Sequence, residues 1–193
     1  MKLVLGTRNS HKLRELSGLL APHELELLPQ QIQLPPETGE TFAENALTKA
    51  RSTAAATGRA ALGEDSGIVV AALDGAPGIR SARYAGEDAT DEQNLQKLLK
   101  AMEAADDRRA AYVCALAFAE PGGEERLFEG RCAGSLARTP EGSGGFGYDP
   151  IFIADEWLGD NLTMASLASE EKDRISHRGR AARLLLEWLA SRS

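Results

Sequence analysis

The chain has 193 residues, 42% of them hydrophobic and 26% charged, and its net charge is −7. This composition is typical of a globular protein and excludes disordered and fibrous classes, because Gly and Pro stay far below the ~25–30% of low-complexity chains. The acidic balance argues against a protein that coats nucleic acid or an anionic membrane. A few converging cations could still bind a small phosphorylated ligand.

Cysteine usage and hydropathy indicate the compartment. Cys114 and Cys132 form neither a CxxC pair nor a metal-binding spacing, which predicts free thiols in a reducing environment. The N-terminal apolar run is too short for a signal peptide, and no stretch approaches the ~18 apolar residues of a membrane span. We therefore expect a cytoplasmic protein.

The first third of the chain alternates strands and helices. Short apolar runs predict strands, and leucines at helical spacing predict an amphipathic helix between them. A capping box, Thr41 with Glu44, opens a longer helix that ends near Gly58. The expected order is strand 2–6, helix 11–20, strand 24–28, loop 30–39 and helix 41–58.

The rest of the chain adds antiparallel pairing. Residues 110–118 and 126–133 predict a hairpin, because both runs are β-like and Pro-Gly-Gly joins them. A second capping box, Thr90 with Gln93, opens a helix that ends at about 104. The other expected elements are strands 60–62 and 68–73 around a sharp turn at 63–67, loop 75–86, loop 141–150 and helix 176–189. This pattern predicts an α/β fold of mixed α+β character, with residues 1–193 in a single domain.

The first candidate site is the turn between the first strand and the first helix. Free N–H groups, the helix dipole and a lysine there favour a bound phosphate. The alternative is that Asn9 or Ser10 merely caps the helix and that Lys12 is solvated. The turn comprises Thr7, Arg8, Asn9, Ser10, His11 and Lys12.

Carboxylates supply the second candidate site. Glu37 lies in a loop, where it is available to a hard cation, and Asn45 and Lys49 share one face of the following helix. Glu64 and Asp65 are adjacent acids in the expected turn, and their repulsion would be offset by a cation. Because Mg²⁺ needs only one or two carboxylates plus substrate phosphates, Glu37 with either acid would suffice. The alternative is an ordinary turn.

Two further segments are candidates for contact with a ligand. The loop at 142–150 matches GxGxxG by letter, but Pro150 and an apolar run follow it instead of a helix, which excludes a dinucleotide-binding fingerprint. Its rings, Phe146 and Tyr148, could stack on a base or pack in the core. At 176–179, two cations open a helix and oppose its dipole, which suggests an anion or an acceptor nearby, with solvation as the alternative.

Other nucleotide and hydrolase classes lack support. The chain contains no GxxxxGK[ST], no HExxH and no GxSxG motif. This argues against P-loop enzymes, zincin proteases and α/β-hydrolases.

Taken together, six motifs in order resemble the inosine triphosphate pyrophosphatase family, in its bacterial dITP/XTP pyrophosphatase branch. The resemblance covers nearly the whole chain. The motifs are Thr7-x-Asn9-x-x-Lys12; Glu37-Thr38-Gly39 with Phe42-x-Glu44-Asn45-Ala46 and Lys49-Ala50; Glu64-Asp65-Ser66-Gly67; Ala76-Pro77-Gly78-Ile79 with Ser81-Ala82-Arg83-Tyr84; Gly145-Phe146-Gly147-Tyr148-Asp149-Pro150; and Ser176-His177-Arg178-Gly179.

The resemblance implies a long, bent, mixed sheet flanked by helices, with two lobes and a cleft between them. It implies a homodimer that requires Mg²⁺ and hydrolyses non-standard purine triphosphates (ITP, dITP, XTP) to the monophosphate and pyrophosphate. A non-catalytic nucleotide sensor and a pyrophosphatase for modified pyrimidine triphosphates stay open as alternatives.

The resemblance also implies roles for single residues. Asp65 matches the general base and, with Glu37, the metal ligands, and Asp65 would act on a water that attacks the α-phosphorus. Family members often have Asp where this chain has Glu64. The implied substrate contacts are the turn Thr7 to Lys12, Lys49, Ser66 and Lys172, and for the base Phe146, Gly147, Tyr148, Asp149, His177 and Arg178.

Overall fold

Local sequence signals set the ends of the helices. In the computed structural model, which describes residues 1–192, both expected capping boxes form: Thr41 with Glu44, and Thr90 with Gln93. Gly58 ends its helix in the left-handed region, at φ 65°, which glycine adopts without strain. The helices are α1 (Ser10–Leu19), α2 (Phe42–Thr57), α3 (Asp91–Ala101), α4 (Ser169–Ile175) and α5 (His177–Ser191).

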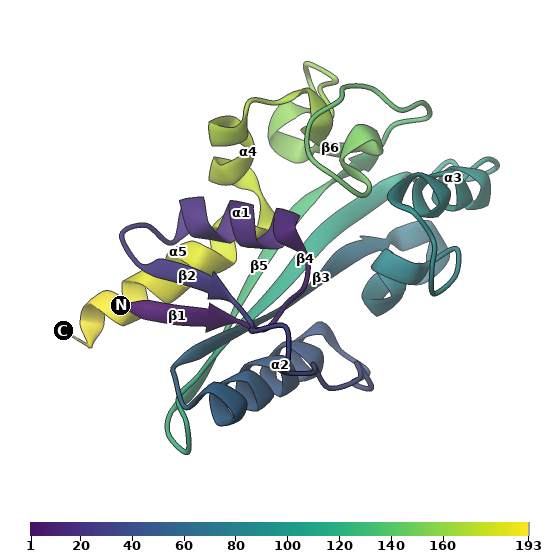
Figure 1. Cartoon of the computed structure of the whole chain (residues 1–193). Coiled ribbons are helices and arrows are strands. Elements are labelled where there is room, and N and C mark those ends of the chain that lie inside the picture. Colours follow the sequence, from purple (N-terminus) through teal and green to yellow (C-terminus); the bar gives the residue numbers. More distant parts are fainter. Residues whose placement is uncertain (193) are drawn as a thin grey trace. The chain divides into compact units, whose positions relative to one another are not determined.

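Six strands form one mixed sheet in the order β2-β1-β3-β4-β5-β6 (Figure 1). Strand β1 pairs in parallel with β2 and β3, and β5 pairs antiparallel with β6. The expected hairpin is confirmed, since Glu120 N donates to Glu124 O at its turn and Leu136 N donates to Arg108 O at its far end. The strands are β1 (Lys2–Leu5), β2 (Glu24–Leu27), β3 (Ala61–Val70), β4 (Arg109–Ala119), β5 (Glu125–Leu136) and β6 (Phe152–Ala154).

The chain divides into two compact units. Unit 1 comprises residues 1–65, 114–130 and 177–193, and unit 2 comprises residues 66–113 and 131–176. Strands β3, β4 and β5 contribute residues to both units. The mixed α/β fold is confirmed, while one domain over residues 1–193 stays a prediction.

Unit 1 has two apolar layers that alternate along its strands. On one face, Leu62 of β3 and Leu116 of β4 pack with leucines of α1 and α5. On the other face, Ala61 and Ala115 pack with the alanines of α2. Successive strand residues point to opposite faces of a sheet, so each residue of β3 belongs to one layer only. Small side chains on the α2 face let that helix approach the sheet closely.

Unit 2 has its own core. Ile68 and Val70 from β3, Leu95 and Leu98 from α3, and Phe152 from β6 are buried in it together. Tyr112 packs its ring at 4.7 Å from the ring of Phe152. Over the described residues, no helix is both long and apolar enough to cross a membrane.

Two sequence predictions about local structure were wrong. The expected turn at 63–67 is the middle of the continuous strand β3, and a short 3-10 helix, Gly78–Arg83, occupies part of the expected loop at 75–86. The expected C-terminal helix is confirmed as α5, and α4, which precedes it, was not predicted. The turn was predicted from the glycines at 63 and 67, but glycine also occurs in strands where another backbone approaches closely.

Candidate active site

The turn after β1 begins α1 through Asn9. The Asn9 side chain accepts hydrogen bonds from the backbone N–H groups of His11 (2.9 Å) and Lys12 (3.2 Å), and Asn9 N donates to Thr7 Oγ1. The capping interpretation of Asn9 is therefore confirmed. Ser10 and His11 lie exposed in the first turn of the helix. Phosphate binding by this turn stays a prediction.

Arg8 has a position that the sequence did not indicate. Its guanidinium donates to the carbonyl oxygens of Leu28 (2.9 Å), Gln30 (3.1 Å) and Ile32. These contacts fix the segment that leaves β2 and leads towards Glu37. The structure therefore shows Arg8 as an anchor for this loop, and a substrate contact by Arg8 stays a prediction.

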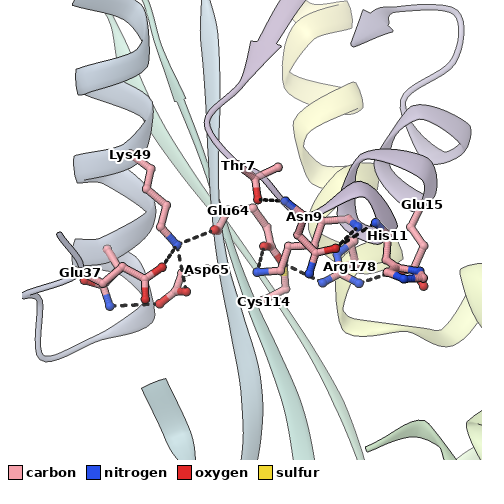
Figure 2. A network of polar contacts seen from close by, with 12 residues as sticks. Thr7, Asn9, His11, Glu15, Glu37, Lys49, Glu64, Asp65, Cys114 and Arg178 are labelled. Carbon is pink, nitrogen blue, oxygen red and sulfur yellow. Dashed lines mark hydrogen bonds and ion pairs between the residues drawn. The ribbon is translucent and has the colours of Figure 1, made fainter. Parts of the chain in front are cut away.

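Lys49 is the centre of a buried polar cluster (Figure 2). Its Nζ pairs with Glu37 Oε1, lies 3.2 Å from Asp65 Oδ1 and donates to the main-chain oxygen of Glu64 at 3.1 Å. Burial alone would lower the pKa of Lys49, but Asp65 and Glu37 outweigh burial and raise it. The ammonium group therefore stays charged between two carboxylates.

Asp65 is held by α2 as well as by Lys49. Asn45 Nδ2 donates to Asp65 Oδ2 at 3.1 Å, while Asn45 Oδ1 accepts from Gly39 N at 2.9 Å. Asn45 thus ties the loop that carries Glu37 to the strand that carries Asp65. The prediction that Asn45 and Lys49 share one helix face is confirmed, but Asn45 was not among the predicted site residues.

The side chain of Asp65 is only 7% exposed, because residue 65 lies within β3 and not in the expected turn. Burial raises the pKa of its carboxyl group, and Lys49 and Lys12 oppose that rise. A carboxylate that is partly desolvated and still in contact with cations is suited to accept a proton or to bind a metal ion.

Close approach of α2 explains the glycine before the two acids. A Cβ atom on Gly63 would lie 2.0 Å from Ala46 O and 2.5 Å from Ala50 N, both backbone atoms of α2. Only glycine lets the helix lie against β3 at this point. The contact brings Asn45 and Lys49 to Asp65.

Glu64 faces the other side of the sheet. Its carboxylate lies 2.5 Å from Lys12 Nζ and accepts from Arg178 Nη2 at 2.9 Å, and Arg178 also pairs with Glu15. Burial alone would lower the pKa of Arg178, but Glu64 and Glu15 outweigh it and raise that pKa. The thiol of Cys114 lies 3.7 Å from Glu64, and burial raises its pKa well above the usual value. Figure 2 shows this network and the Lys49 cluster along β3.

Unit 2 contains a second cluster of predicted site residues. Lys172 Nζ lies 2.8 Å from Asp149 Oδ2 and 5.4 Å from the centre of the Phe146 ring. Asp149 also accepts from Phe146 N at 2.9 Å, which folds the glycine-rich loop back on itself. Tyr148 is buried and donates to Ser81 O at 2.8 Å, so its ring packs in the core of unit 2. The ring of Phe146 is only half-buried, so it remains partly accessible.

The remaining predicted residues divide between the two units. Ser66, half-buried, opens the unit 2 part of β3, while His177, 5% exposed, begins α5 in unit 1. The residues at 146–149 and Lys172 belong to unit 2, whereas Arg178 belongs to unit 1. A common base pocket of all these residues stays a prediction.

Comparison with known proteins decides the family. A family model described as the Ham1 family matches residues 3–188. The chain belongs to the Ham1 family. The Ham1-family chain is 47% identical to a Geobacter sulfurreducens protein named dITP/XTP pyrophosphatase, over 97% of this chain and 96% of that protein. It is 46% identical to an Escherichia coli K12 protein of the same name, over 97% and 98%.

Solved structures agree with this assignment. The Ham1 protein of Staphylococcus aureus superposes with a TM-score of 0.89 at 37% identity and covers 100% of both chains. A HAM1 protein from Coxiella burnetii superposes with a TM-score of 0.87 at 43% identity and covers 99% of both. The family and fold that the six motifs indicated are therefore confirmed.

Proposed function

We propose that this chain hydrolyses the non-standard purine triphosphates ITP, dITP and XTP to the monophosphate and pyrophosphate, and so removes them from the nucleotide pool. The observation that carries the proposal is the convergence of Glu37 and Asp65 on one buried cation, the ammonium group of Lys49. The names of the relatives, dITP/XTP pyrophosphatase, point to the same reaction.

The residues present fit a magnesium ion. Both acids offer the hard oxygen ligands that Mg²⁺ prefers, and they already share one cation, the ammonium of Lys49. Over the described part of the chain there is no group of three or more His, Cys, Asp or Glu that could hold a metal. Two carboxylates are sufficient if the phosphates of the substrate supply further ligands to the ion. We propose Glu37 and Asp65 as its protein ligands.

The chain's own residues then supply most of the proposed chemistry. Asp65 accepts a proton from the water that attacks the α-phosphorus, and Asn45 orients its carboxylate. Lys49 and Lys12 offset the charge of the phosphates and of the departing pyrophosphate, with the turn that begins at Thr7 as the triphosphate-binding segment. A bound Mg²⁺ would withdraw charge from the phosphate oxygens.

Base recognition is assigned to the loop at 146–149 with His177 and Arg178, Lys172 is assigned to the phosphates, and Ser66 is assigned a position beside the substrate. Supporting this assignment, Phe146 is half-buried next to the Asp149–Lys172 pair and can offer a ring face to a purine. Donor groups in this set would pair with the 6-oxo group of hypoxanthine and xanthine, which accepts hydrogen bonds, and not with the amino group of adenine.

We further propose a homodimer in the cytoplasm as the working form of the chain. The buried Cys114 and Cys132 form no disulfide, which agrees with a reducing compartment. Size-exclusion chromatography with light scattering tests the dimer.

A nucleotide panel tests the function. Purified protein is incubated with ITP, dITP, XTP, GTP, ATP and a modified pyrimidine triphosphate, with Mg²⁺ or with chelator, and pyrophosphate and orthophosphate are measured separately. The expected result is IMP and pyrophosphate from ITP. Orthophosphate with IDP accumulating, or ITP binding without turnover, would contradict the proposal, the latter in favour of a nucleotide sensor.

A further inference from the structure

Two adjacent acids of β3 serve different networks because a strand alternates its faces. Asp65 points to α2, where it meets Asn45 and Lys49. Glu64 points to the opposite face, which also carries Leu62 and the side chains of α1 and α5. Only the main-chain oxygen of Glu64 reaches Lys49. The carboxylate of Glu64 is therefore not directed at the cation position shared by Glu37 and Asp65.

The Glu64 side chain is fully buried, with an exposed fraction of 0%. A carboxylate removed from water is strongly destabilised unless cations or hydrogen-bond donors compensate it. Here each oxygen has a different cation: Oε1 accepts from Arg178 Nη2 at 2.9 Å, and Oε2 lies 2.5 Å from Lys12 Nζ. Arg178 belongs to α5 and Lys12 to α1. Glu64 of β3 therefore holds one cationic side chain from each of these two helices.

Of the two cations, Lys12 depends more on Glu64 for the position of its charged group. A lysine has a long flexible stem, and its ammonium group is a point charge that many rotamers can place elsewhere. With a side chain only 16% exposed and an ion pair to a buried carboxylate, Lys12 is held in one position before any ligand arrives. Arg178 depends less on Glu64, because Glu15 pairs with its other terminal nitrogen.

We propose that Glu64 is a positioning residue, not a metal ligand, and that it acts by holding the ammonium group of Lys12 in place for the substrate phosphates. The proposal rests on the function proposed above for the loaded site. It accounts for a fully buried acid next to Asp65 without assigning two strand neighbours on opposite faces to one metal ion.

The substitution Glu64→Gln separates the two contacts of Glu64. The amide oxygen can still accept from Arg178, but the amide NH₂ then faces Lys12 with a donor and displaces it. Loss of one charge-assisted contact to phosphate predicts a fall in kcat/KM for ITP of about ten- to a hundredfold. Removing a negative charge would by itself favour anion binding, so a fall identifies lost positioning.

A double-mutant cycle with Lys12→Met tests whether Glu64 acts through Lys12. Methionine keeps the length of the stem and removes the charge. We expect Glu64→Gln to change kcat/KM by less than about twofold in the Lys12→Met background. Glu64→Asp keeps a carboxylate and should recover at least part of the loss. Thermal unfolding of every variant establishes that it is folded.

A second readout needs no substrate. The amine of Lys12 is labelled with a lysine-specific acylating reagent and quantified by mass spectrometry against the exposed Lys2. Labelling of Lys12 should rise several-fold in Glu64→Gln and stay unchanged in Cys114→Ala, which disturbs packing beside Glu64 without altering charge. This arm stays valid even if the wild-type chain fails to hydrolyse ITP, which would contradict the proposed function alone.

Three outcomes would overturn the positioning role. The first is a kcat/KM for Glu64→Gln equal to or above that of the wild type. The second is an effect that multiplies with that of Lys12→Met, as an independent structural defect would. The third is Lys12 labelling that does not respond to Glu64→Gln.

Discussion

The contact between Gly63 and α2 offers a direct test of how packing sets the site. In Gly63→Ala the new methyl carbon would begin 2.0 Å from Ala46 O and 2.5 Å from Ala50 N. Real Cβ atoms essentially never lie within 3.0 Å of such neighbours, so the helix backbone must retreat by 1 Å or more. No side-chain rotation can relieve the clash, because both atoms belong to the backbone.

The expected destabilisation follows from this geometry. Inserting a methyl group into a well-packed core typically lowers the free energy of unfolding by 1–3 kcal/mol, and a backbone clash belongs at the upper end, about 3 kcal/mol. The matched control is Gly18→Ala in the last turn of α1, where an added Cβ meets nothing within 4 Å. Alanine there should raise the free energy of unfolding by up to about 1 kcal/mol.

The same displacement has a functional consequence. Asn45 and Lys49 both belong to α2, and their contacts with Asp65 measure 3.1 and 3.2 Å. A shift of the helix by 1 Å would break both hydrogen bonds, since such bonds weaken steeply beyond normal length. We therefore expect kcat/KM for ITP to fall roughly a hundredfold in the folded fraction, as for other catalytic groups displaced by 1 Å.

Urea unfolding followed by circular dichroism and initial rates of pyrophosphate release measure the two effects. Rates are compared at a temperature where each variant is folded. A Gly63→Ala variant with unfolding free energy within 0.5 kcal/mol of the wild type would refute the packing argument. Full activity in a destabilised variant would refute the link between α2 and the carboxylate of Asp65.

Further predictions follow from the Lys49 cluster and the base contacts. Asp65→Asn keeps one acceptor oxygen for Asn45 or Lys49, so it should fold normally by circular dichroism while losing at least ~10²–10⁴-fold in kcat through the missing base; retention of a tenth of the wild-type rate at saturating Mg²⁺ would contradict this role. Chelation should abolish turnover and added Mg²⁺ should restore it, while Glu37→Gln should raise the Mg²⁺ concentration for half-maximal rate about tenfold or more by removing one ionised ligand; an unchanged magnesium titration would exclude Glu37 as a ligand. The order of kcat/KM should be ITP or XTP, then GTP, then ATP, because each donor left facing a donor lowers kcat/KM by about ten- to a hundredfold; equal efficiency with ATP would contradict a donor-lined base site.

The sequence predicts those features of this site that depend on residues close together in the chain. Caps are local, so Thr41 with Glu44 and Thr90 with Gln93 located their helices correctly, and Asn9 capped α1 as its residue type suggested. The pairing of Asn45 with Lys49 on one face also followed from helical spacing alone. Contacts between distant segments have no such signal. Nothing near Arg8 in sequence indicates that it binds the carbonyl oxygens of residues 28, 30 and 32.

The wrong prediction at residues 63–67 shows that a glycine does not by itself distinguish a turn from a strand. A turn and a close helix-strand contact both require a residue without a side chain, and the choice depends on a helix that lies elsewhere in the chain. With a turn, Glu64 and Asp65 would be exposed neighbours free to share one cation. With a strand, alternation sends them to opposite faces, so their charges are compensated separately, Asp65 by Lys49 and Glu64 by Lys12 and Arg178. Residues 63–67 therefore contribute only Asp65 to a metal site with two carboxylates, and the second carboxylate must come from a different segment. Glu37, which pairs with the same lysine as Asp65, is the partner that we propose.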